Sequence, residues 1–296
     1  MNQDISICVL TENEMGWTEP FELDKVQILD NYYLSAQKSD IAFLKKMDTA
    51  RLLAGFRTTA GIDTKGVRPY GGWEDSLLGG HCVGHYLTAL AQAVKVTGDK
   101  ELKEKSQTLI AGLEECQKKL GTGFLFGAKV EDKEDVEKQF DILEGKKKGE
   151  TWVPWYNMHK VLAGLVDTYK YTGNETALLV AEKLGDWIYE RVSKWDLKTN
   201  QKVLETEYGG MNDCLYELYS YSHNKHHLEA AQKFDEKALF LMAAKGEKNC
   251  LDGKHANTQI PKFIGAIKRY NVLKQLGEAK QEDEAYLVDA EKFFEM

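Results

Sequence analysis

The stretch "MHKVLAGLVDTYKY" (158–171), followed by "TGN" (172–174) and "ETALLVAEKLGDWIYERV" (175–192), decides the fold. Apolar residues recur every three to four positions in both long segments, which is the spacing of a helix with one buried face. The first segment is mostly apolar, whereas the second mixes apolar and charged residues. The short Gly-Asn sequence between them is typical of a tight turn. The stretch therefore predicts two packed helices, an apolar inner one and a charged outer one.

The same order of segments returns along the chain at intervals of about 50 residues, except that residues 127–150 lengthen the first interval, from Gly98 to Gly173, to 75. The further copies are 82–97 with 100–120, 213–221 with 225–243, and 261–278 with 285–295. Such repetition of helix pairs predicts an all-α fold, most simply an (α/α)6 toroid whose inner helices line a central space. A helical solenoid is the alternative, because it also stacks helix pairs.

The organisation expected outside the repeats is simple. Residues 1–29 form an N-terminal arm, and residues 30–296 form one barrel domain that opens with a helical stretch at 30–57. Residues 127–150, "GAKVEDKEDVEKQFDILEGKKKGE", interrupt the repeat with a run of charges. We interpret this insertion as a solvated excursion or a lid rather than as a separate domain.

Composition and charge narrow the class of protein. The 296 residues carry a formal net charge of −8, which argues against a nucleic-acid partner or an anionic membrane surface. No apolar run is long enough to span a bilayer, and the N-terminus lacks a basic region before its short apolar patch. The five cysteines are odd in number and contain no C-x-x-C pair, so we expect free thiols in a cytoplasmic protein.

Polar or aromatic clusters precede each apolar helix. They are "GGHCVGH" (79–85), "TWVPWYNMHK" (151–160), "ETEYGGMND" (205–213) and "HANTQIP" (255–261). If the inner helices run parallel around a ring, their N-termini meet at one rim, where the candidate residues are His81, Trp155, His159, Asn212, Asp213, His255 and Gln259. Neutral hydrogen-bonding groups beside a flat indole suit a sugar, so this rim is the predicted saccharide site.

Each cluster also has plainer interpretations. Trp152 and Trp155 fit a core equally well, and Asp213 suits a helix N-terminus as well as it suits a carboxylate pair with Glu207. His81 and His85 have the i, i+4 spacing of metal ligands, but no acidic third ligand lies nearby in the sequence. A buried, hydrogen-bonded His85 is therefore expected instead.

Cys82 and Cys214 each follow a residue of these clusters. A catalytic thiol needs a base fixed beside it, and the sequence places none next to either cysteine. A nucleophilic role is therefore the less favoured interpretation.

The blocks "GGHCVGHYLTALAQAVKVTGD", "VPWYNMHKVLAGLVDTYKYTGN", "EYGGMNDCLYELY" and "LDGKHANTQIPKFIGAIKRY" resemble, in order, those of the β-L-arabinofuranosidase-type glycoside hydrolases of family 127 and the related family 146. The resemblance extends over roughly residues 25–296. It implies an (α/α)6 barrel, usually followed by β-sandwich domains, and the release of arabinofuranose from plant-type glycans or glycoproteins. It also implies that His81, His159 and His255 help to bind the sugar.

The resemblance implies catalytic residues that this sequence does not match. In the family a zinc-bound cysteine of a Cys-Cys block is the nucleophile, a further Cys and a Glu are zinc ligands, and another Glu is the acid/base, all expected downstream of 255–261. None of the five cysteines stands in such a block, so we assign this chain no catalytic residue, no metal ligand and no cofactor. Zinc is expected only in the complete family enzyme. Asp213 also departs, because the family block usually has Glu there.

We therefore expect the first part of such a toroid, incomplete on its C-terminal side, to bind an arabinofuranoside or related saccharide. An open toroid exposes the flanks of its end helices, so a partner chain or self-association is expected to complete it. The resemblance points to a glycosidase, but the isolated chain lacks the implied nucleophile. The alternatives are a non-catalytic carbohydrate-binding module and a helical scaffold without a ligand.

Overall fold

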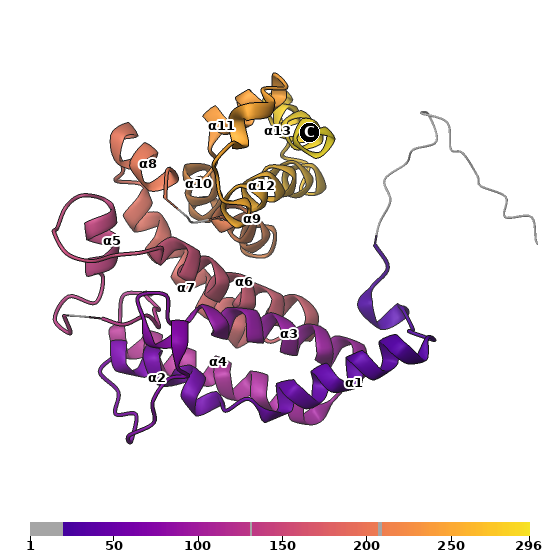
Figure 1. Ribbon diagram of the computed structural model, residues 1–296, viewed down its shortest axis with the longest axis vertical. Helices are drawn as coiled ribbons and strands as arrows, with labels where there is room; N and C mark the ends of the chain where they lie inside the picture. Colours follow the sequence, from indigo (N-terminus) through magenta and orange to yellow (C-terminus); the bar gives the residue numbers. More distant parts are fainter. Residues whose placement is uncertain (1–19, 131, 207–208) are drawn as a thin grey trace, which may run out of the picture.

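The computed structural model describes residues 20–130, 132–206 and 209–296, and within these ranges every regular element is helical. The prediction of an all-α fold built from repeated helix pairs is confirmed (Figure 1). Within these ranges, no helix is both long enough and apolar enough to cross a membrane.

The chain before the repeats consists of two helices where a single helical stretch was predicted. After a short 3-10 turn, η1 (Leu23–Lys25), come α1 (Asn31–Lys46) and α2 (Thr49–Thr59). The break lies at Asp48, whose side chain accepts hydrogen bonds from the amides of Ala50 and Arg51 and so begins a new helix. Of the expected arm, residues 1–19 lie outside the described residues.

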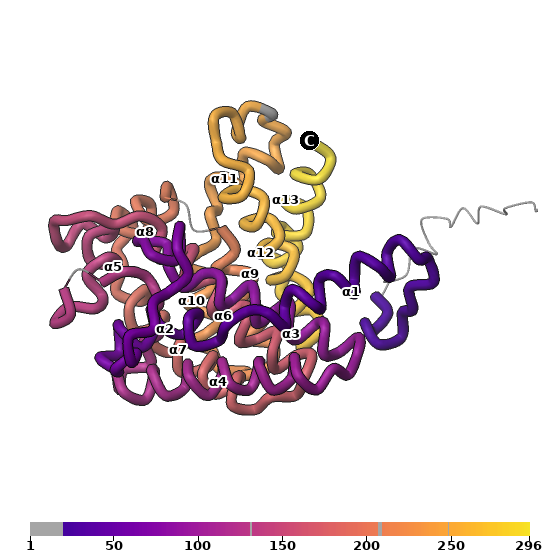
Figure 2. Tube along the Cα trace, turned by 60° about the horizontal axis from the view of Figure 1, so that its bottom comes forward, coloured from indigo at the N-terminus to yellow at the C-terminus, as the bar shows by residue number. Residues whose placement is uncertain are grey.

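Four helix pairs follow, as the repeat predicted, but the single charged helix expected at 225–243 is two helices, Lys225–Lys233 and Lys237–Ala244. They are α3 (His81–Thr97) with α4 (Lys100–Leu120), α6 (Pro154–Thr172) with α7 (Glu175–Val192), α9 (Met211–Ser222) with α10 (Lys225–Lys233), and α12 (Ala256–Gln275) with α13 (Glu284–Glu295). The first member of each pair packs against the first member of the next, and α4, α7 and α10 form an outer row. The pairs follow one another around an arc, with α1 and α13 at its two ends (Figures 1 and 2).

The turn has one local design in the first three pairs. The first helix ends on a residue in the left-handed conformation, Gly98 (φ 67°) or Gly173 (φ 67°), which terminates its hydrogen bonding. The next residue, Asp99 or Asn174, accepts a hydrogen bond from an amide of the second helix through its side chain. The third pair repeats this design with a non-glycine residue, His223 (φ 51°).

Glycines set the separation between α3 and α6. A Cβ on Gly84 would overlap the carbonyl of Lys160, and a Cβ on Gly164 would lie 2.8 Å from the Cα of Gly84. The two backbones therefore touch where they cross, which only glycine permits.

The charged insertion is not a solvated excursion. It contains the short helix α5 (Lys138–Leu143), whose Phe140 is fully buried in the main core against Trp155 and Trp187. One continuous core runs from α2 through α10 and includes these rings. The correction has a physical reason: the charges of the segment find partners on α7, so the backbone can lie close to the core.

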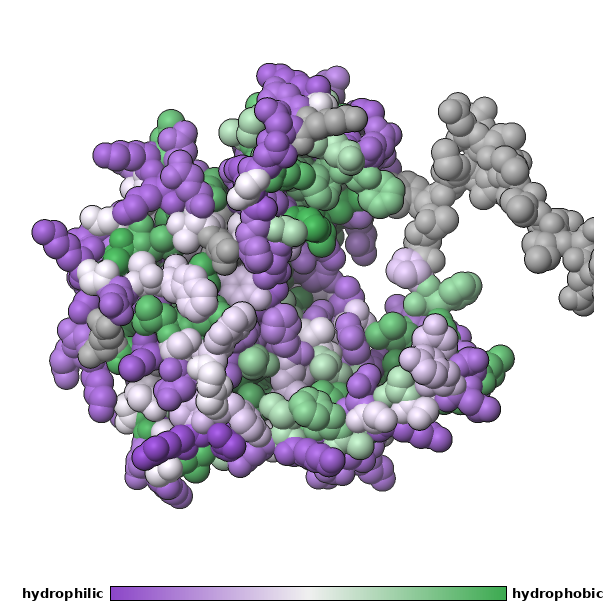
Figure 3. Space-filling view, in the orientation of Figure 1, coloured by the Kyte–Doolittle hydropathy of each residue, from purple (hydrophilic) through white to green (hydrophobic). Residues whose placement is uncertain are grey.

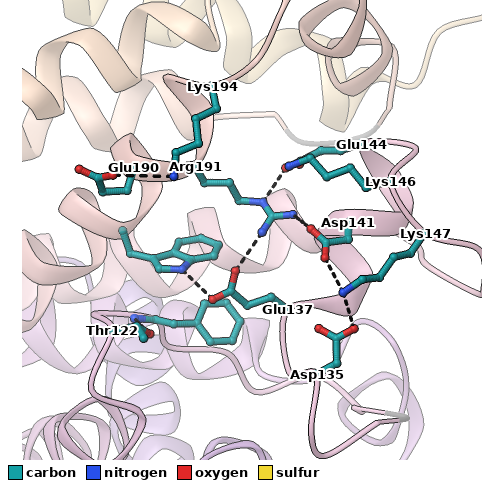
Figure 4. A network of polar contacts seen from close by, with 12 residues as sticks. Thr122, Asp135, Glu137, Asp141, Glu144, Lys146, Lys147, Glu190, Arg191 and Lys194 are labelled. Carbon is teal, nitrogen blue, oxygen red and sulfur yellow. Dashed lines mark hydrogen bonds and ion pairs between the residues drawn. The ribbon is translucent and has the colours of Figure 1, made fainter.

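Those partners surround Arg191 of α7, which is nearly buried (Figure 4). Its guanidinium donates to Glu137, Asp141 and Glu144 over 2.5 to 2.9 Å, and Lys147 bridges Asp141 and Asp135. The acidic run that looked like a solvated face is therefore the anchor that fixes the insertion to the outer row of helices.

The C-terminal part carries a second, smaller core, formed by α11 (Lys237–Ala244), η3 (Lys248–Leu251), α12 and α13. Two further short elements are α8 (Leu197–Leu204) and η4 (Gln281–Asp283). Apolar side chains remain exposed on α11, α12 and α13, among them Leu241, Ile264 and Phe294. Others are exposed on α1, at the other end of the arc (Figure 3).

Candidate functional site

The N-termini of the inner helices lie side by side at one rim of the arc. The side chain of Asn157 in α6 donates to the carbonyl of Gly79, just ahead of α3. The ring of His159 abuts the glycine that precedes α9, and a Cβ on Gly209 would lie 2.7 Å from the carbonyl oxygen of Thr258 in α12. The order α3, α6, α9, α12 is therefore kept at this rim.

An aromatic cluster, here called the aromatic rim, lies at the N-termini of α3 and α6. It consists of Trp73, His81, His85, Trp152 and Tyr156. The ring of His81 is its centre, with ring centroids 6.4 Å from Trp73, 6.1 Å from His85 and 6.2 Å from Tyr156. The indoles of Trp73 and Trp152 meet edge to face at 6.3 Å and are 65% and 45% exposed. Two aromatic faces are thus available to a ligand beside two imidazoles.

Two local devices hold this cluster in place. The 3-10 turn η2 (Gly72–Asp75) carries Trp73 and Glu74, and the Glu74 carboxylate accepts the amides of Gly80 and Cys82 at the start of α3. The same carboxylate lies 3.0 Å from Nδ1 of His81. Burial lowers the pKa of His81, but its hydrogen bonds to Cys82 and Glu74 outweigh burial and raise it to about 10.

Charged groups continue from the aromatic rim along the inner helices. The Lys160 ammonium lies 4.7 Å from the centroid of Tyr156, and burial lowers its pKa. Burial raises the pKa of Asp213 on α9, and the nearby Glu217 and Asp167 add to this against the opposing Lys268 and Lys170. One oxygen of Asp213 is buried without a hydrogen-bonding partner among the described residues.

This environment predicts that Asp213→Asn stabilises the protein at neutral pH. A raised pKa means that the carboxyl favours folding only while it is protonated, below its ordinary value of 3.8, and that this contribution is lost as pH rises through the folded-state value. We expect the free energy of unfolding at pH 7 to rise by on the order of 1 kcal/mol, with the gain vanishing below about pH 4. Urea denaturation at pH 7 and below about pH 4 measures this gain in the free energy of unfolding. Asp40→Asn, at an exposed position of α1, is the control. An equal gain at both pH values would contradict the prediction.

The structure places the predicted site residues unequally. His81 and His159 both lie at the rim, with Tyr156 between them, although they are only 7% and 6% exposed. Burial holds the pKa of His159 well below its usual value, so this imidazole is neutral. His255 is the exposed N-cap residue of α12, and Gln259 lies one turn further on, 8% exposed.

Two predicted residues face the core and not the rim. Trp155 is fully buried, with its ring packed against Phe140, Trp195 and Phe234, so it offers no stacking face. Asn212 is also fully buried, and its amide donates to the carbonyl of Lys262 and to Asp235. Asn212 therefore joins α9 to α12, and Trp155 has the core role that the sequence left open for it.

Two further expectations concern His85 and Glu207. His85 is exposed and belongs to the aromatic rim, so the expected core histidine is wrong. Partial desolvation of the imidazole and the charges of Lys160 and His81 lower its pKa. Glu207, the conceivable carboxylate partner of Asp213, lies outside the described residues.

Sequence reasoning missed Trp73, Glu74 and Tyr156. A signal was present for the first two, because "GGWE" (71–74) has the glycine pair that marks the other clusters and lies just before "GGHC" (79–82). Tyr156 carries no separate sequence signal, since it directly follows Trp155 in an aromatic cluster.

Comparison with known proteins supplies the family. The family model described as "Beta-L-arabinofuranosidase, GH127 catalytic domain" matches residues 25–294. The chain belongs to this family. Comparison with curated proteins found no match.

Solved structures of GH127 proteins share the fold. A GH127 β-L-arabinofuranosidase from Geobacillus stearothermophilus T6, Ara127N-Se, is 17% identical with a TM-score of 0.51, over 89% of this chain and 41% of that one. The GH127 β-arabinofuranosidase BT3674 is 16% identical with a TM-score of 0.58, over 93% of this chain and 43% of that one. The chain thus spans about two fifths of the length of these GH127 structures.

The described cysteines do not fit the zinc set that the family resemblance implies. Cys82, Cys116, Cys214 and Cys250 are free thiols in four different elements, and no two are adjacent. Burial raises the pKa of Cys116 to about 12 and that of Cys214 well above its usual value, so neither is a ready thiolate. We therefore derive no catalytic step through a zinc-bound cysteine in this part of a GH127 domain.

Proposed function

We propose that the aromatic rim binds an arabinofuranoside or a related plant-type saccharide. The observation that carries this proposal is the pair of exposed indoles, Trp73 and Trp152, which meet edge to face beside His81 in a chain of the GH127 family. Sugar rings present C–H faces that stack on indoles, and their hydroxyls need neutral donors and acceptors close by.

Each group has a distinct task in this proposal. Trp152 and Trp73 supply the stacking faces, and His85 and Tyr156 supply hydrogen bonds at their edge. His159, neutral and buried behind Tyr156, supports the tyrosine ring. His255 and Gln259, at the start of α12, extend the site along the rim. Asp213 lies on the inner wall below it, where its charge affects Lys160.

The proposal extends to the role of the whole chain. The chain forms the saccharide-binding part of a GH127-type glycosidase, in which other residues supply the nucleophile and bind the zinc. Exposed apolar side chains on α1, α12 and α13, at the ends of the arc, support a partner chain or self-association that completes the toroid. The free thiols of the four cysteines in the described ranges support a cytoplasmic location.

The test measures binding and hydrolysis separately. Methyl β-L-arabinofuranoside is titrated into the purified chain by calorimetry, and hydrolysis of p-nitrophenyl β-L-arabinofuranoside is followed with and without added zinc and dithiothreitol. We expect binding without hydrolysis, and we expect Trp152→Ala to weaken binding about tenfold, since one stacked ring contributes about 0.5 to 1.5 kcal/mol.

The matched control is Tyr33→Ala, which removes another exposed ring, 62% accessible, from α1. It is expected to leave binding unchanged. Equal affinities of Trp152→Ala and the unchanged chain would contradict the proposed site. Hydrolysis by the purified chain would show that the catalytic groups lie within these residues.

A further inference from the structure

We propose that Glu74, His81 and Cys82 form a binding site for a divalent metal of the zinc type at the N-terminus of α3. One donor atom from each residue lies within 4.8 Å of the donor atoms of the other two. This site is distinct from the cysteine pair of the family resemblance, because it contains a single thiol and an imidazole. It shares His81 with the aromatic rim, but it requires neither of the rim's indoles.

Glu74 fixes the geometry of the site from outside α3. Its two carboxylate oxygens accept the amides of Gly80 at 2.9 Å and Cys82 at 3.2 Å. Gly80 has a φ of 95°, which allows the chain to turn sharply into the helix. The backbone that carries both the imidazole and the thiol is therefore held by the carboxylate that completes the donor set.

The imidazole of His81 is oriented as metal-binding histidines are. Its Nδ1 lies 2.7 Å from the carbonyl oxygen of Leu78, so the Nδ1–H is donated to that carbonyl and the Glu74 carboxylate remains available as a ligand. A histidine that binds a metal usually donates its other ring N–H to a carboxylate or a backbone carbonyl. The free lone pair then lies on Nε2, which faces the sulfur of Cys82.

The distance between the two remaining donors fits zinc. Nε2 of His81 and Sγ of Cys82 are 3.7 Å apart. With Zn–N near 2.05 Å and Zn–S near 2.3 Å, a tetrahedral angle places nitrogen and sulfur roughly 3.6 Å apart. An ion can therefore bridge the two atoms with almost no movement of either side chain.

The donor types select the metal. A thiolate and an imidazole favour zinc over magnesium and calcium, which prefer oxygen ligands, and a carboxylate is a normal third ligand of zinc. The thiolate and the carboxylate together balance the two positive charges of the ion. His85, exposed one turn further along the same helix, lies beside the site with its ring centroid 6.1 Å from that of His81.

The competing arrangement is an ion pair without a metal. The hydrogen bonds that His81 donates to Cys82 and Glu74 raise its pKa and describe an imidazolium that keeps its proton at neutral pH. A thiolate–imidazolium pair would make Cys82 reactive toward alkylating reagents and would bind no metal. The experiment must therefore detect the metal–sulfur bond itself.

The test uses cobalt as a spectroscopic substitute for zinc. Chelator-treated, reduced protein is titrated with Co²⁺, and the near-ultraviolet thiolate-to-cobalt band and the visible bands of tetrahedral cobalt are recorded before zinc is added. We expect one cobalt per chain, displaced by one zinc. Cys82→Ser should abolish the thiolate band, and Glu74→Gln should weaken zinc binding by about 10- to 100-fold.

Matched controls separate this site from other thiols and histidines. Cys250→Ser and His226→Gln should leave the cobalt spectrum unchanged, and Trp152→Ala should do the same even if saccharide binding is lost. Circular dichroism checks that each variant is folded, and Cys82→Ser replaces only sulfur by oxygen in a half-buried side chain. The absence of a thiolate band in the unchanged chain, or its persistence in Cys82→Ser, would overturn the proposal. Rapid alkylation of Cys82 without cobalt binding would also overturn it and would show the ion pair instead.

Discussion

Gly84→Ala is expected to lower the free energy of unfolding by about 3 kcal/mol or more. The new Cβ would overlap the backbone carbonyl of Lys160 on α6, and a backbone cannot swing aside as a flexible side chain does. Helices α3 and α6 would have to separate, and their contact carries both the main core and the aromatic rim. Urea denaturation followed by circular dichroism measures the loss.

The sign of the stability change in Gly84→Ala tests whether α3 and α6 touch at their crossing. In a helix interior with free space, replacing glycine by alanine stabilises a protein by up to about 1 kcal/mol. Gly71→Ala is the matched control, because Gly71 has a φ of −72° and no atom lies within 4 Å of its added Cβ. It should change stability by less than about 0.5 kcal/mol. A stabilised Gly84→Ala variant would show that the two helices do not cross in contact.

The helix pairs were predictable because their signals are local. Helical spacing of apolar residues and a Gly-Asp or Gly-Asn turn act within one pair, and the structure realises both at Gly98–Asp99 and Gly173–Asn174. The break at Asp48 was also local, since an aspartate before a threonine can begin a helix, but the continuous apolar pattern masked it. The GH127 assignment followed from four such blocks in order.

The site was less predictable because exposure depends on distant residues. Trp152 and Trp155 are near neighbours in one cluster, yet one is 45% exposed and the other fully buried. Trp155 is covered by rings from distant elements, among them Phe140 of the insertion and Phe234 after α10. Nothing in the sequence around 151–160 contains that information. The same holds for Glu74, which reaches His81 only because the chain folds back through η2.

The insertion was misjudged for a related reason. A run of Asp, Glu and Lys is usually solvated, and local sequence cannot show that one arginine, Arg191, lies within reach of three of the carboxylates. A run of charged residues predicts exposure to water, but a buried counter-charge on another helix can hold the same residues against the core.

A buried arginine also holds the C-terminal pair, so Arg269→Met is expected to cost about 3 to 5 kcal/mol of folding stability. Arg269 on α12 is 6% exposed and donates to Asp283 at 2.7 Å and 2.9 Å, to Asp235 at 2.9 Å and to the hydroxyl of Tyr286 at 2.8 Å. Methionine fills much of the same volume but leaves two buried carboxylates, 5% and 2% exposed, without their counter-charge. The cost comes from those carboxylates more than from the lost contacts.

This cost should fall selectively on α12 and α13, since the arginine joins them to Asp235, which follows α10. Hydrogen exchange should therefore speed up in α12 and α13 more than in α3 and α6, whose core is separate. Arg68→Met, at an exposed arginine, is the control and should change stability by less than about 0.5 kcal/mol. If Arg269→Met instead behaves like Arg68→Met, the two carboxylates take up protons or water at little cost, and the C-terminal pair is held by its small apolar core alone.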